Sequence, residues 1–371
     1  MKKILFLTHC YPSSKDDTRG IFFRYWIKEL ISNNINIDVI TPSWNKDKKL
    51  VIKSGDYGEI IHLFPWNLKI GSLKILNLRD IFSFFYFLLI WKNVIYKINK
   101  KNNYDLVIAA WGIPSGLLLS NKSLRNIKKV IWWLGSDYHK FKKGLFKFVL
   151  QYLVNIADEN WTDTIEMRNG LRKLSNASIN HVPNQPISFN SVKGKRINKI
   201  PKILSIGRLE KVKNFEFGIR AVKEIINSGI NASYEIIGYG TEQEILEREI
   251  GDEKNIRLLG FKNKEYINQK LKNIDIFLIT SITEGAVNTF FEALAAGKVI
   301  VSTDVGDIKK IISNTSLGFT SPQNDLKALV KNLKKAINGE LEFDNSAAEK
   351  IFTKYSPNIS INAALKLVNT N

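Results

Sequence analysis

Two glutamates flank the start of one predicted helix, in the most informative stretch of this chain. Glu284 and Glu292 have seven residues between them, in a segment that reads as strand end, loop, helix and strand. The free N–H groups at the helix start favour a bound phosphate, and carboxylates accept hydrogen bonds from sugar hydroxyls. We therefore predict a nucleotide-sugar site, with Glu284 in the loop and Glu292 about two turns inside the helix. The donor-binding residues predicted between them are Gly285, Ala286, Val287, Asn288 and Thr289.

The spacing alone is weak evidence, because Glu216 and Glu224 repeat it within NFEFGIRAVKEII. A solvated amphipathic helix explains that first pair. The second pair follows the predicted strand IDIFLIT, and small residues ending in Gly297 close its helix. Such an ending suits close helix packing and a glycine C-cap.

Two cations upstream could neutralise a diphosphate. PKILSIGRLEKVKN reads as a strand, Gly207, and then Arg208 and Lys213 with four residues between them. The planar Arg fork and the compact Lys charge suit phosphate oxygens, so this chemistry would require no metal. The chain is rich in Lys and Arg, and a structural role remains the alternative, but the position directly after a strand favours the site. No two aspartates lie two residues apart, as a metal-holding Asp-x-Asp would need.

These motifs resemble the retaining glycosyltransferases of family 4, the group 1 glycosyltransferases, which carry Arg-x4-Lys and later Glu-x7-Glu. Further similar segments are Pro183-Asn184, YEIIGYG, IRLLGF and STDVGDIKKII, so the resemblance covers most of the chain and is strongest over 181–322. It implies a GT-B architecture, in which two Rossmann-like α/β domains with parallel sheets face each other across a cleft. It also implies transfer with retention from a nucleoside diphosphate sugar, without a further cofactor.

The resemblance also assigns site residues. Arg208 and Lys213 would stabilise the departing diphosphate, Glu284 would hold the donor sugar and Glu292 the ribose. Donor contacts are further expected at the loop glycines Gly20, Gly207, Gly238 and Gly240.

Asp137 in LGSDYHKF would either orient an acceptor hydroxyl, or take its proton, or cap the following helix. One departure stands out: related enzymes often place a His before Trp111, and this chain has Ala110. The usual sugar contact would then change, with Asp137 or His139 as candidate replacements.

Composition predicts two domains in a reducing compartment. The 371 residues suit two cores, and Cys10 is the only cysteine, so no intramolecular disulfide can form. Alternating strand and helix patterns predict two α/β domains, over 1–185 and 198–354, joined by a linker within 183–201. By resemblance, the first domain would bind the acceptor and the second the nucleotide-sugar donor. By resemblance the tail 355–371 packs back on the first domain. The start MKKILFLTHC reads as a strand rather than a signal peptide, so we expect cytoplasmic residence.

The formal charge of +20 predicts an anionic partner. No zinc spacing, helix-turn-helix or RNA-binding motif supports nucleic acid, so an anionic membrane surface is the better candidate. FKKGLFKFVLQYLV reads either as an interfacial amphipathic helix or as a core-facing helix with a basic side. Its apolar positions at helical spacing are Phe141, Leu145, Phe148, Val149, Tyr152 and Leu153. The apolar run 81–91 is too short to cross a bilayer and is predicted to be a buried helix; its aromatic density leaves the alternative that part of it touches lipid.

The acceptor predicted from these features is a lipid-linked saccharide or a surface polysaccharide precursor. Three alternatives stay open. Another GT-B enzyme, such as a phosphorylase, synthase or epimerase, would use the same cleft. A non-catalytic scaffold would bind a nucleotide or glycan without turnover, and Ala110 is its best argument. A nucleic-acid-binding protein would show strongly salt-dependent affinity.

Overall fold

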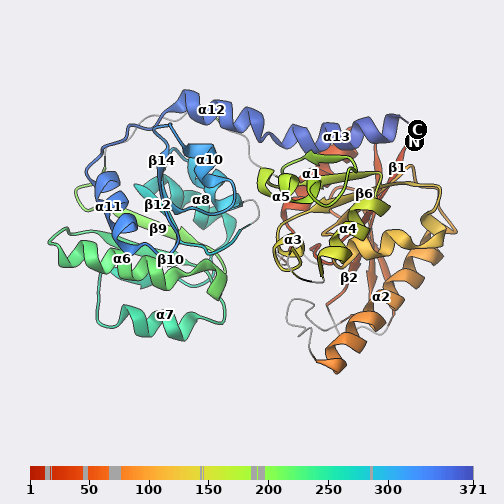
Figure 1. The fold of residues 1–371 in the computed structure, drawn as a ribbon, viewed down its shortest axis with the longest axis horizontal. Coiled ribbons are helices and arrows are strands. Elements are labelled where there is room, and N and C mark those ends of the chain that lie inside the picture. The colour runs from red at the N-terminus through yellow and green to blue at the C-terminus, as the bar shows by residue number, and fades with distance from the viewer. Residues whose placement is uncertain are drawn as a thin grey trace. The chain divides into compact units, whose positions relative to one another are not determined.

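The computed structural model comprises two compact units built from parallel sheets. Unit 1 is Met1–Pro186 with Pro357–Asn371, and unit 2 is Ile187–Ser356. The structure describes residues 1–12, 17, 19–44, 49–66, 77–142, 144, 146–184, 190, 197–284 and 287–370. The predicted α/β class is confirmed (Figure 1). Most of the predicted linker, together with Gly285 and Ala286, lies outside the described residues.

Unit 1 contains an eight-stranded sheet in the order β3-β4-β2-β1-β5-β6-β7-β8. All neighbouring pairs are parallel except β3 with β4, which is antiparallel. The strands are β1 (Lys3–Leu7), β2 (Asn36–Pro42), β3 (Val51–Ser54), β4 (Ile60–Phe64), β5 (Leu106–Ala110), β6 (Lys128–Trp133), β7 (Glu159–Thr162) and β8 (Ile179–His181).

Helices cover both faces of this sheet. They are α1 (Phe22–Ser32), α2 (Leu78–Asn99), α3 (Ser136–His139), α4 (Phe146–Ile156), α5 (Ile165–Arg172) and α13 (Pro357–Asn369), with the 3-10 helices η2 (Ser115–Ser120) and η3 (Lys122–Leu124). Alternate residues of a strand point to opposite faces, so Ile4 and Phe6 of β1 join the core under α1 and α13. Leu5 and Leu7 join the core under α2 and α4.

Unit 2 contains a six-stranded parallel sheet in the order β11-β10-β9-β12-β13-β14. Its strands are β9 (Lys202–Ile206), β10 (Ser233–Ile237), β11 (Ile256–Leu258), β12 (Ile276–Ile279), β13 (Val299–Thr303) and β14 (Gly318–Ser321). Its helices are η4 (Lys211–Lys213), α6 (Phe215–Asn227), α7 (Gln243–Ile250), α8 (Lys264–Asn273), α9 (Asn288–Ala295), α10 (Ile308–Ile312), α11 (Leu326–Ile337) and α12 (Asn345–Lys354). Two apolar cores flank the sheet, one on each face.

Two helix predictions need correction. The apolar run 81–91 lies in α2, as expected of a helix, but α2 is not buried all round: Phe82 is 73% exposed and Phe87 is fully buried. In the basic segment, α4 buries Leu153 but leaves Phe148 68% exposed and Tyr152 50% exposed. Phe148 and Tyr152 of the predicted apolar face therefore point away from the core, whereas Phe141 and Val149 pack against it, and Leu145 lies outside the described residues.

Candidate active site

The switch point of the unit 2 sheet gathers the predicted cations and one predicted glutamate. Strands β9 and β12 are neighbours, and the chain proceeds from them toward opposite edges of the sheet. Ligands of open parallel sheets bind outside the carboxyl ends of strands at such a point. Gly207 and Arg208 follow β9 here, and Thr280 and Ser281 follow β12.

Lys213 and Glu284 form an ion pair at this switch point. Lys213 Nζ lies 2.5 Å from Glu284 Oε1, and the two side chains are only 20% and 13% exposed. Gly207 makes room for the lysine, because a Cβ there would lie 3.3 Å from Lys213 Cε. The lysine ends η4, and Asn214 in the left-handed conformation (φ 49°) then starts α6. The pair holds a partly buried cation that keeps further N–H groups for a ligand.

The two loops that carry this pair are joined by hydrogen bonds. The Thr280 hydroxyl donates to the Lys213 carbonyl at 3.1 Å, and the Ile282 N–H donates to the Val212 carbonyl at 2.8 Å. The Ser281 hydroxyl donates to Glu284 Oε1 at 2.6 Å. The lysine and the glutamate are therefore positioned by the backbone of both loops, not by their own contact alone.

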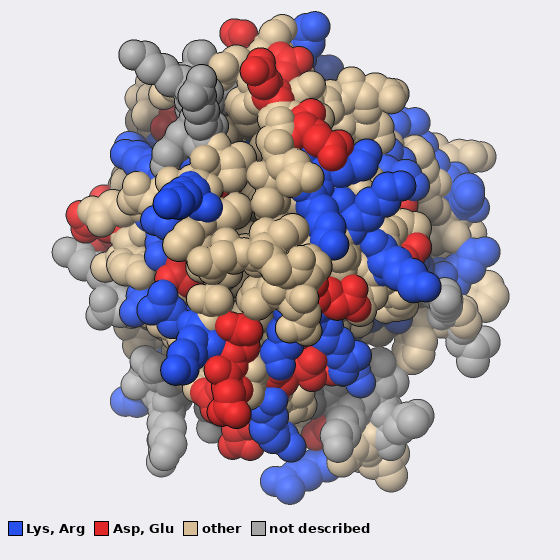
Figure 2. All heavy atoms as spheres, turned by 90° about the vertical axis from the view of Figure 1, so that its left-hand side faces the viewer, with Lys and Arg blue, Asp and Glu red and all other residues tan. Residues whose placement is uncertain are grey.

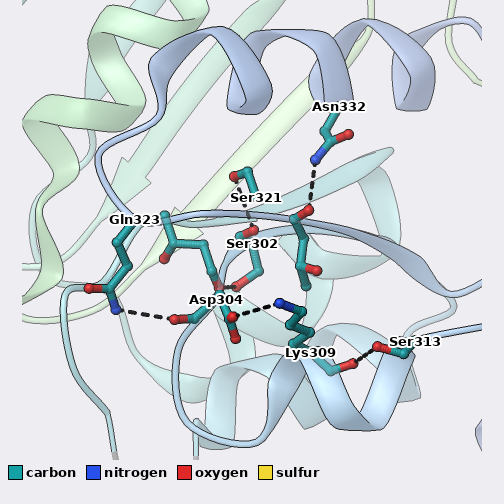
Figure 3. A network of polar contacts seen from close by, with 9 residues as sticks. Ser302, Asp304, Lys309, Ser313, Ser321, Gln323 and Asn332 are labelled. Atoms are coloured by element: carbon teal, nitrogen blue, oxygen red, sulfur yellow. Dashed lines mark hydrogen bonds and ion pairs between the residues drawn. The ribbon is translucent and has the colours of Figure 1, made fainter.

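Gln323, which follows the carboxyl end of β14, supports the loop after β12. Its amide donates to the Ile282 carbonyl at 2.7 Å and to the Asp304 carbonyl at 3.1 Å. Figure 3 shows it reaching toward Asp304, whose side chain is paired with Lys309 at 3.0 Å. Sequence reasoning missed Gln323, because nothing in its sequence neighbourhood distinguishes it from any surface amide.

Arg208 stands ready for an anion. Its side chain is exposed, and in the described part of the chain no ion pair joins it to a carboxylate. Arg208 and Lys213 thus both follow β9, one exposed and the other held by Glu284. This arrangement offers a planar fork and a compact charge beside one strand end.

Glu292 lies one turn into α9, which begins at Asn288, so the predicted depth of two turns is wrong. Its carboxylate is paired with Lys264 Nζ at 2.5 Å, and these side chains are 17% and 49% exposed. Lys264 is the first residue of α8, after the N-cap Asn263. Lys264 could not be selected from the sequence, because one lysine among many carries no signal without its partner.

The start of α9 holds the remaining described donor candidates. Val287 is buried at the N-cap position, and Asn288 and Thr289 are the first two helical residues. Among the described residues, the buried Asn288 Oδ1 has no hydrogen-bond donor. A ligand hydroxyl would satisfy it. Gly285 and Ala286 lie outside the described residues.

Gly238 and Gly240 follow β10 and are required for close backbone approach. A Cβ on Gly238 would lie 1.8 Å from the Gly207 carbonyl oxygen, and one on Gly240 would lie 2.3 Å from the Leu209 carbonyl oxygen. Between them, Tyr239 is 55% exposed and lies edge-on to Phe261, which is 57% exposed, with 5.9 Å between ring centroids. The glycines shape the loop beside β9, and the aromatic pair offers a stacking surface.

The switch point of the unit 1 sheet, between β1 and β5, carries aromatic rings instead of paired charges. His9 follows β1 and stacks against Trp111, which follows β5, with 4.5 Å between ring centroids. Burial lowers the pKa of His9 to about 4, so its imidazole is neutral near pH 7. Ala110, where a histidine was expected by resemblance, is fully buried at the end of β5. The imidazole beside Trp111 is therefore that of His9, in the loop after β1.

Asp137 is a buried residue whose carboxylate holds two loops together. Its Oδ2 accepts the Gly112 N–H at 2.6 Å, and its Oδ1 accepts the N–H groups of Gly135, Tyr138 and Leu134 at 3.0 to 3.3 Å. Only 2% of it is exposed, and burial raises its pKa to about 6 although these bonds oppose the rise. This geometry favours a positioning role over the orientation of an acceptor hydroxyl.

Gly20 likewise has a local structural reason. Its φ is 63°, and a Cβ there would lie 2.1 Å from the Cys10 carbonyl oxygen. The glycine therefore holds the loop before α1 against the loop after β1. His139 ends α3, where its ring lies 5.2 Å from that of Tyr138. In the described part of the chain, no three His, Cys, Asp or Glu residues gather closely enough to hold a metal ion.

Comparisons with known proteins agree with this architecture. The sequence profile of the family described as "Glycosyl transferases group 1" matches residues 188–354, and that described as "Glycosyl transferase 4-like" matches residues 14–164. The chain belongs to the group 1 glycosyltransferases with the GT-B fold.

Its relatives include the amylovoran biosynthesis glycosyltransferase AmsK of Erwinia amylovora, which is 30% identical over 47% of this chain and 46% of the relative. The putative colanic acid biosynthesis glycosyltransferase WcaL of Escherichia coli is 29% identical over 36% of this chain and 35% of the relative. The alignments thus span less than half the length of these curated relatives.

Solved structures share the whole fold. The apo form of the lipopolysaccharide outer core galactosyltransferase WaaB has a TM-score of 0.72 at 18% identity, over 99% of both chains. A trehalose-6-phosphate enzyme of Escherichia coli, bound with UDP-2-fluoro glucose, has a TM-score of 0.74 at 10% identity, again over 99% of both chains. At these identities the likeness concerns the fold alone.

Proposed function

We propose that this protein transfers a sugar from a nucleoside diphosphate sugar to a hydroxyl acceptor with retention. The observation that carries the proposal is the Lys213–Glu284 ion pair at the switch point of unit 2, beside the exposed Arg208. A cation and a carboxylate held together can meet the two ends of a sugar diphosphate. The lysine suits the phosphate oxygens and the glutamate suits the sugar hydroxyls.

The departing diphosphate would be stabilised by Arg208 and Lys213. Both groups are in place before the bond breaks, so their charge needs little rearrangement as negative charge develops. The N-terminus of α9 adds N–H donors and a positive dipole end. On this proposal the reaction uses no metal ion and no cofactor beyond the donor.

The sugar and the ribose would be held by the two glutamates. Glu284 accepts from donor-sugar hydroxyls on its remaining lone pairs, because its partners among the described residues, Lys213 and Ser281, both contact Oε1. Glu292 accepts from the ribose, with its other partner Lys264 beside it. Asn288 supplies a further acceptor.

The base would lie near the exposed pair Tyr239 and Phe261. Every nucleobase has a face that stacks on an aromatic ring, so this pair sets the place of the base without deciding which base it is. The backbone at Gly238, Gly240 and Gly260 supplies the polar contacts that would decide it.

The acceptor we propose is a lipid-linked saccharide or a surface polysaccharide precursor, with the reaction on the cytoplasmic face of the cell membrane. The printed names of AmsK, WcaL and WaaB, which concern amylovoran, colanic acid and lipopolysaccharide, support this class. The family resemblance implies that attack comes from the leaving-group face, so we assign no enzymic nucleophile.

A non-catalytic nucleotide-binding role is the second candidate. Ala110 and the buried Asp137 favour it, since neither can take a proton from an acceptor. Both candidates predict nucleotide binding at Arg208, and only the transferase predicts turnover.

The experiment is a donor and acceptor screen followed by NMR of the product. Purified protein is incubated with UDP-, GDP- and ADP-sugars and a lipid-linked saccharide extract, and nucleoside diphosphate release is measured. We expect release that depends on the acceptor and a product with the anomeric configuration of the donor. Nucleotide binding without release would favour the non-catalytic role, and an inverted product would refute retention.

A further inference from the structure

Helix α2 carries two apolar stripes, and only one of them is covered. The covered stripe lies in the core of unit 1. Its members recur at helical spacing and are Phe87, Trp91, Val94, Ile95 and Ile98. The second stripe faces solvent. Its members and exposed fractions are Leu78 (73%), Phe82 (73%), Phe85 (59%), Tyr86 (62%) and Leu89 (59%).

An uncovered stripe of this size is unusual for a helix on the surface of a soluble domain. Helices at a domain surface normally carry polar residues on the outer face, and a helix apolar all round belongs in a core or a membrane. Within the described residues α2 is the one helix long and apolar enough to cross a bilayer, and 28% of its most apolar window is buried.

The covered stripe argues against α2 crossing a membrane. Phe87 packs against Phe64, Trp66 and Trp91, and crossing would pull all of these contacts apart. Figure 1 shows α2 on the outside of unit 1, with one side toward the sheet. An in-plane helix can immerse the other side by several ångströms and keep the core intact.

Helix α4 extends the same surface. It packs on the same face of the sheet as α2, and both helices contact η2. Its exposed aromatic residues are Phe146 (39%), Phe148 (68%) and Tyr152 (50%). We name the exposed aromatic residues of α2 and α4 the aromatic face. Phenylalanine and tyrosine suit the boundary between headgroups and acyl chains.

The charge around the aromatic face selects an anionic partner. Within residues 78–156 the only acids are Asp80, Asp105 and Asp137, while lysine and arginine recur throughout. Asp105 is paired with Lys2 at 3.1 Å, and Asp137 is buried. On the side of the molecule that Figure 2 shows, where α7 and α11 lie, both signs of charge occur together instead.

The same charge argues against a second copy of this chain as the cover. Two aromatic faces brought together would oppose the exposed Lys92 and Lys97 of each copy, and Asp80 is the single acid in the sequence of α2. Anionic lipid supplies both the apolar layer and the counter-charge, and each lysine near such a surface adds to the attraction.

We propose that unit 1 docks on the surface of a bilayer containing anionic lipid through the aromatic face, with α2 lying in the plane of the headgroups. This docking concerns unit 1 alone, and it holds whether or not the transfer reaction is as proposed.

The test is flotation of the full chain with vesicles. Vesicles of phosphatidylglycerol and phosphatidylcholine should carry the protein to the top of the gradient at low salt, and pure phosphatidylcholine should carry about tenfold less. The double variant Phe82→Ser/Phe85→Ser should bind the anionic vesicles at least about tenfold more weakly, because two large apolar groups no longer enter the acyl boundary.

The matched control is Tyr25→Ser/Ile52→Ser, which removes two other exposed apolar residues of unit 1, 48% and 59% exposed. It should float like the unchanged chain, and thermal unfolding should show that both double variants are folded. Equal flotation of the two variants would overturn the proposal. So would a chain that stays at the bottom with every vesicle, or one that is dimeric in light scattering and becomes monomeric on Phe82→Ser/Phe85→Ser.

Discussion

The two sheets end differently at equivalent places. Each unit has a parallel sheet with one switch point, β1 beside β5 in unit 1 and β9 beside β12 in unit 2. The strand ends of unit 2 carry Arg208 and the Lys213–Glu284 pair. Those of unit 1 carry the stacked rings of His9 and Trp111. The same topology therefore offers a charged site in one unit and an uncharged aromatic site in the other.

The sheet topology thus determines where a site lies, and the residues of the loops determine its chemistry. A diphosphate needs positive charge beside it, and unit 2 offers Arg208 and Lys213 in the loop after β9. A saccharide acceptor carries no such charge, and a neutral imidazole beside a tryptophan suits its hydroxyls and its apolar faces. We therefore assign the donor to unit 2 and the acceptor to unit 1, as the family resemblance implies.

The largest effect should come from removing the paired cation. Lys213→Ala takes away preorganised charge at the leaving group, so turnover should fall about 10²- to 10³-fold, which is about 3 to 4 kcal/mol of the barrier. Steady-state kinetics with a saturating donor measures it. Lys211→Ala, in the same 3-10 helix, is the matched control and should stay near normal. A Lys213→Ala enzyme with unchanged turnover would remove the role given to this lysine.

Next comes the buried carboxylate of unit 1. Asp137→Asn places an amide NH₂ against the Gly112 N–H, so the free energy of unfolding should fall by about 1 to 3 kcal/mol. Denaturant titration measures the change. The control is Asp158→Asn at an exposed aspartate, which accepts one N–H, that of Lys129, at 2.7 Å. Equal stability of the two variants would show that Asp137 does not hold these loops.

A smaller effect is expected at the support of the Glu284 loop. Gln323→Ala removes two hydrogen bonds to carbonyl groups, and we expect roughly a tenfold lower kcat/KM, or about 1.4 kcal/mol, from a less well positioned Glu284. Asn332→Ala is the control, because Asn332 belongs to the same network in Figure 3 and bonds to Thr320 instead. If both variants lose activity equally, the effect belongs to the network and not to the loop.

A further effect concerns pH and separates His9 from Asp137. Below about pH 6.5 the unfolded chain protonates His9 while the folded chain keeps it neutral down to about 4, so this histidine lowers stability as the pH falls through that range. The raised pKa of Asp137, about 6, acts in the opposite sense: its contribution is present below about pH 4 and is lost as the pH rises to 6.

We therefore compare the unfolding free energy of His9→Asn with that of the unchanged chain. This difference should shift in favour of the variant when the pH is lowered from 7 to 4.5. Unfolding free energies at the two values measure this difference. An identical pH dependence in His9→Asn would show that the imidazole is not kept neutral by burial.

Much of the architecture was predictable from apolar strand patterns. ILFLT, LVIAA and VIVST predicted β1, β5 and β13, since a parallel strand covered on both faces is almost wholly apolar. Strands β7 and β8, with the sequences ENWT and INH, were not recognised. Their polar residues bond to neighbouring elements, as Asn160 does to the Val154 carbonyl of α4, and this context is invisible in a short window.

Site residues could be predicted where their type and order in the sequence identified them. Contacts between segments distant in the chain could not be predicted in this way. Arg208, Lys213 and Glu284 were selected by type and order, and their assignment stays a prediction. The partner of Glu292, Lys264, and the support from Gln323 depend on approaches between segments distant in the chain. The outer stripe of α2 was mistaken for core because hydropathy alone does not tell which side of a helix is covered.

The most direct test of the donor site in unit 2 is thermal unfolding with UDP, GDP, ADP and CMP, and with their sugar conjugates. A ligand that binds only the folded state raises the melting temperature, by an amount that grows with the ligand concentration relative to its dissociation constant. We predict a shift with one nucleoside diphosphate and its sugar, lost in Arg208→Ala and Lys213→Ala but kept in Lys211→Ala. No shift with any nucleotide, or an equal shift in all three variants, would contradict the account.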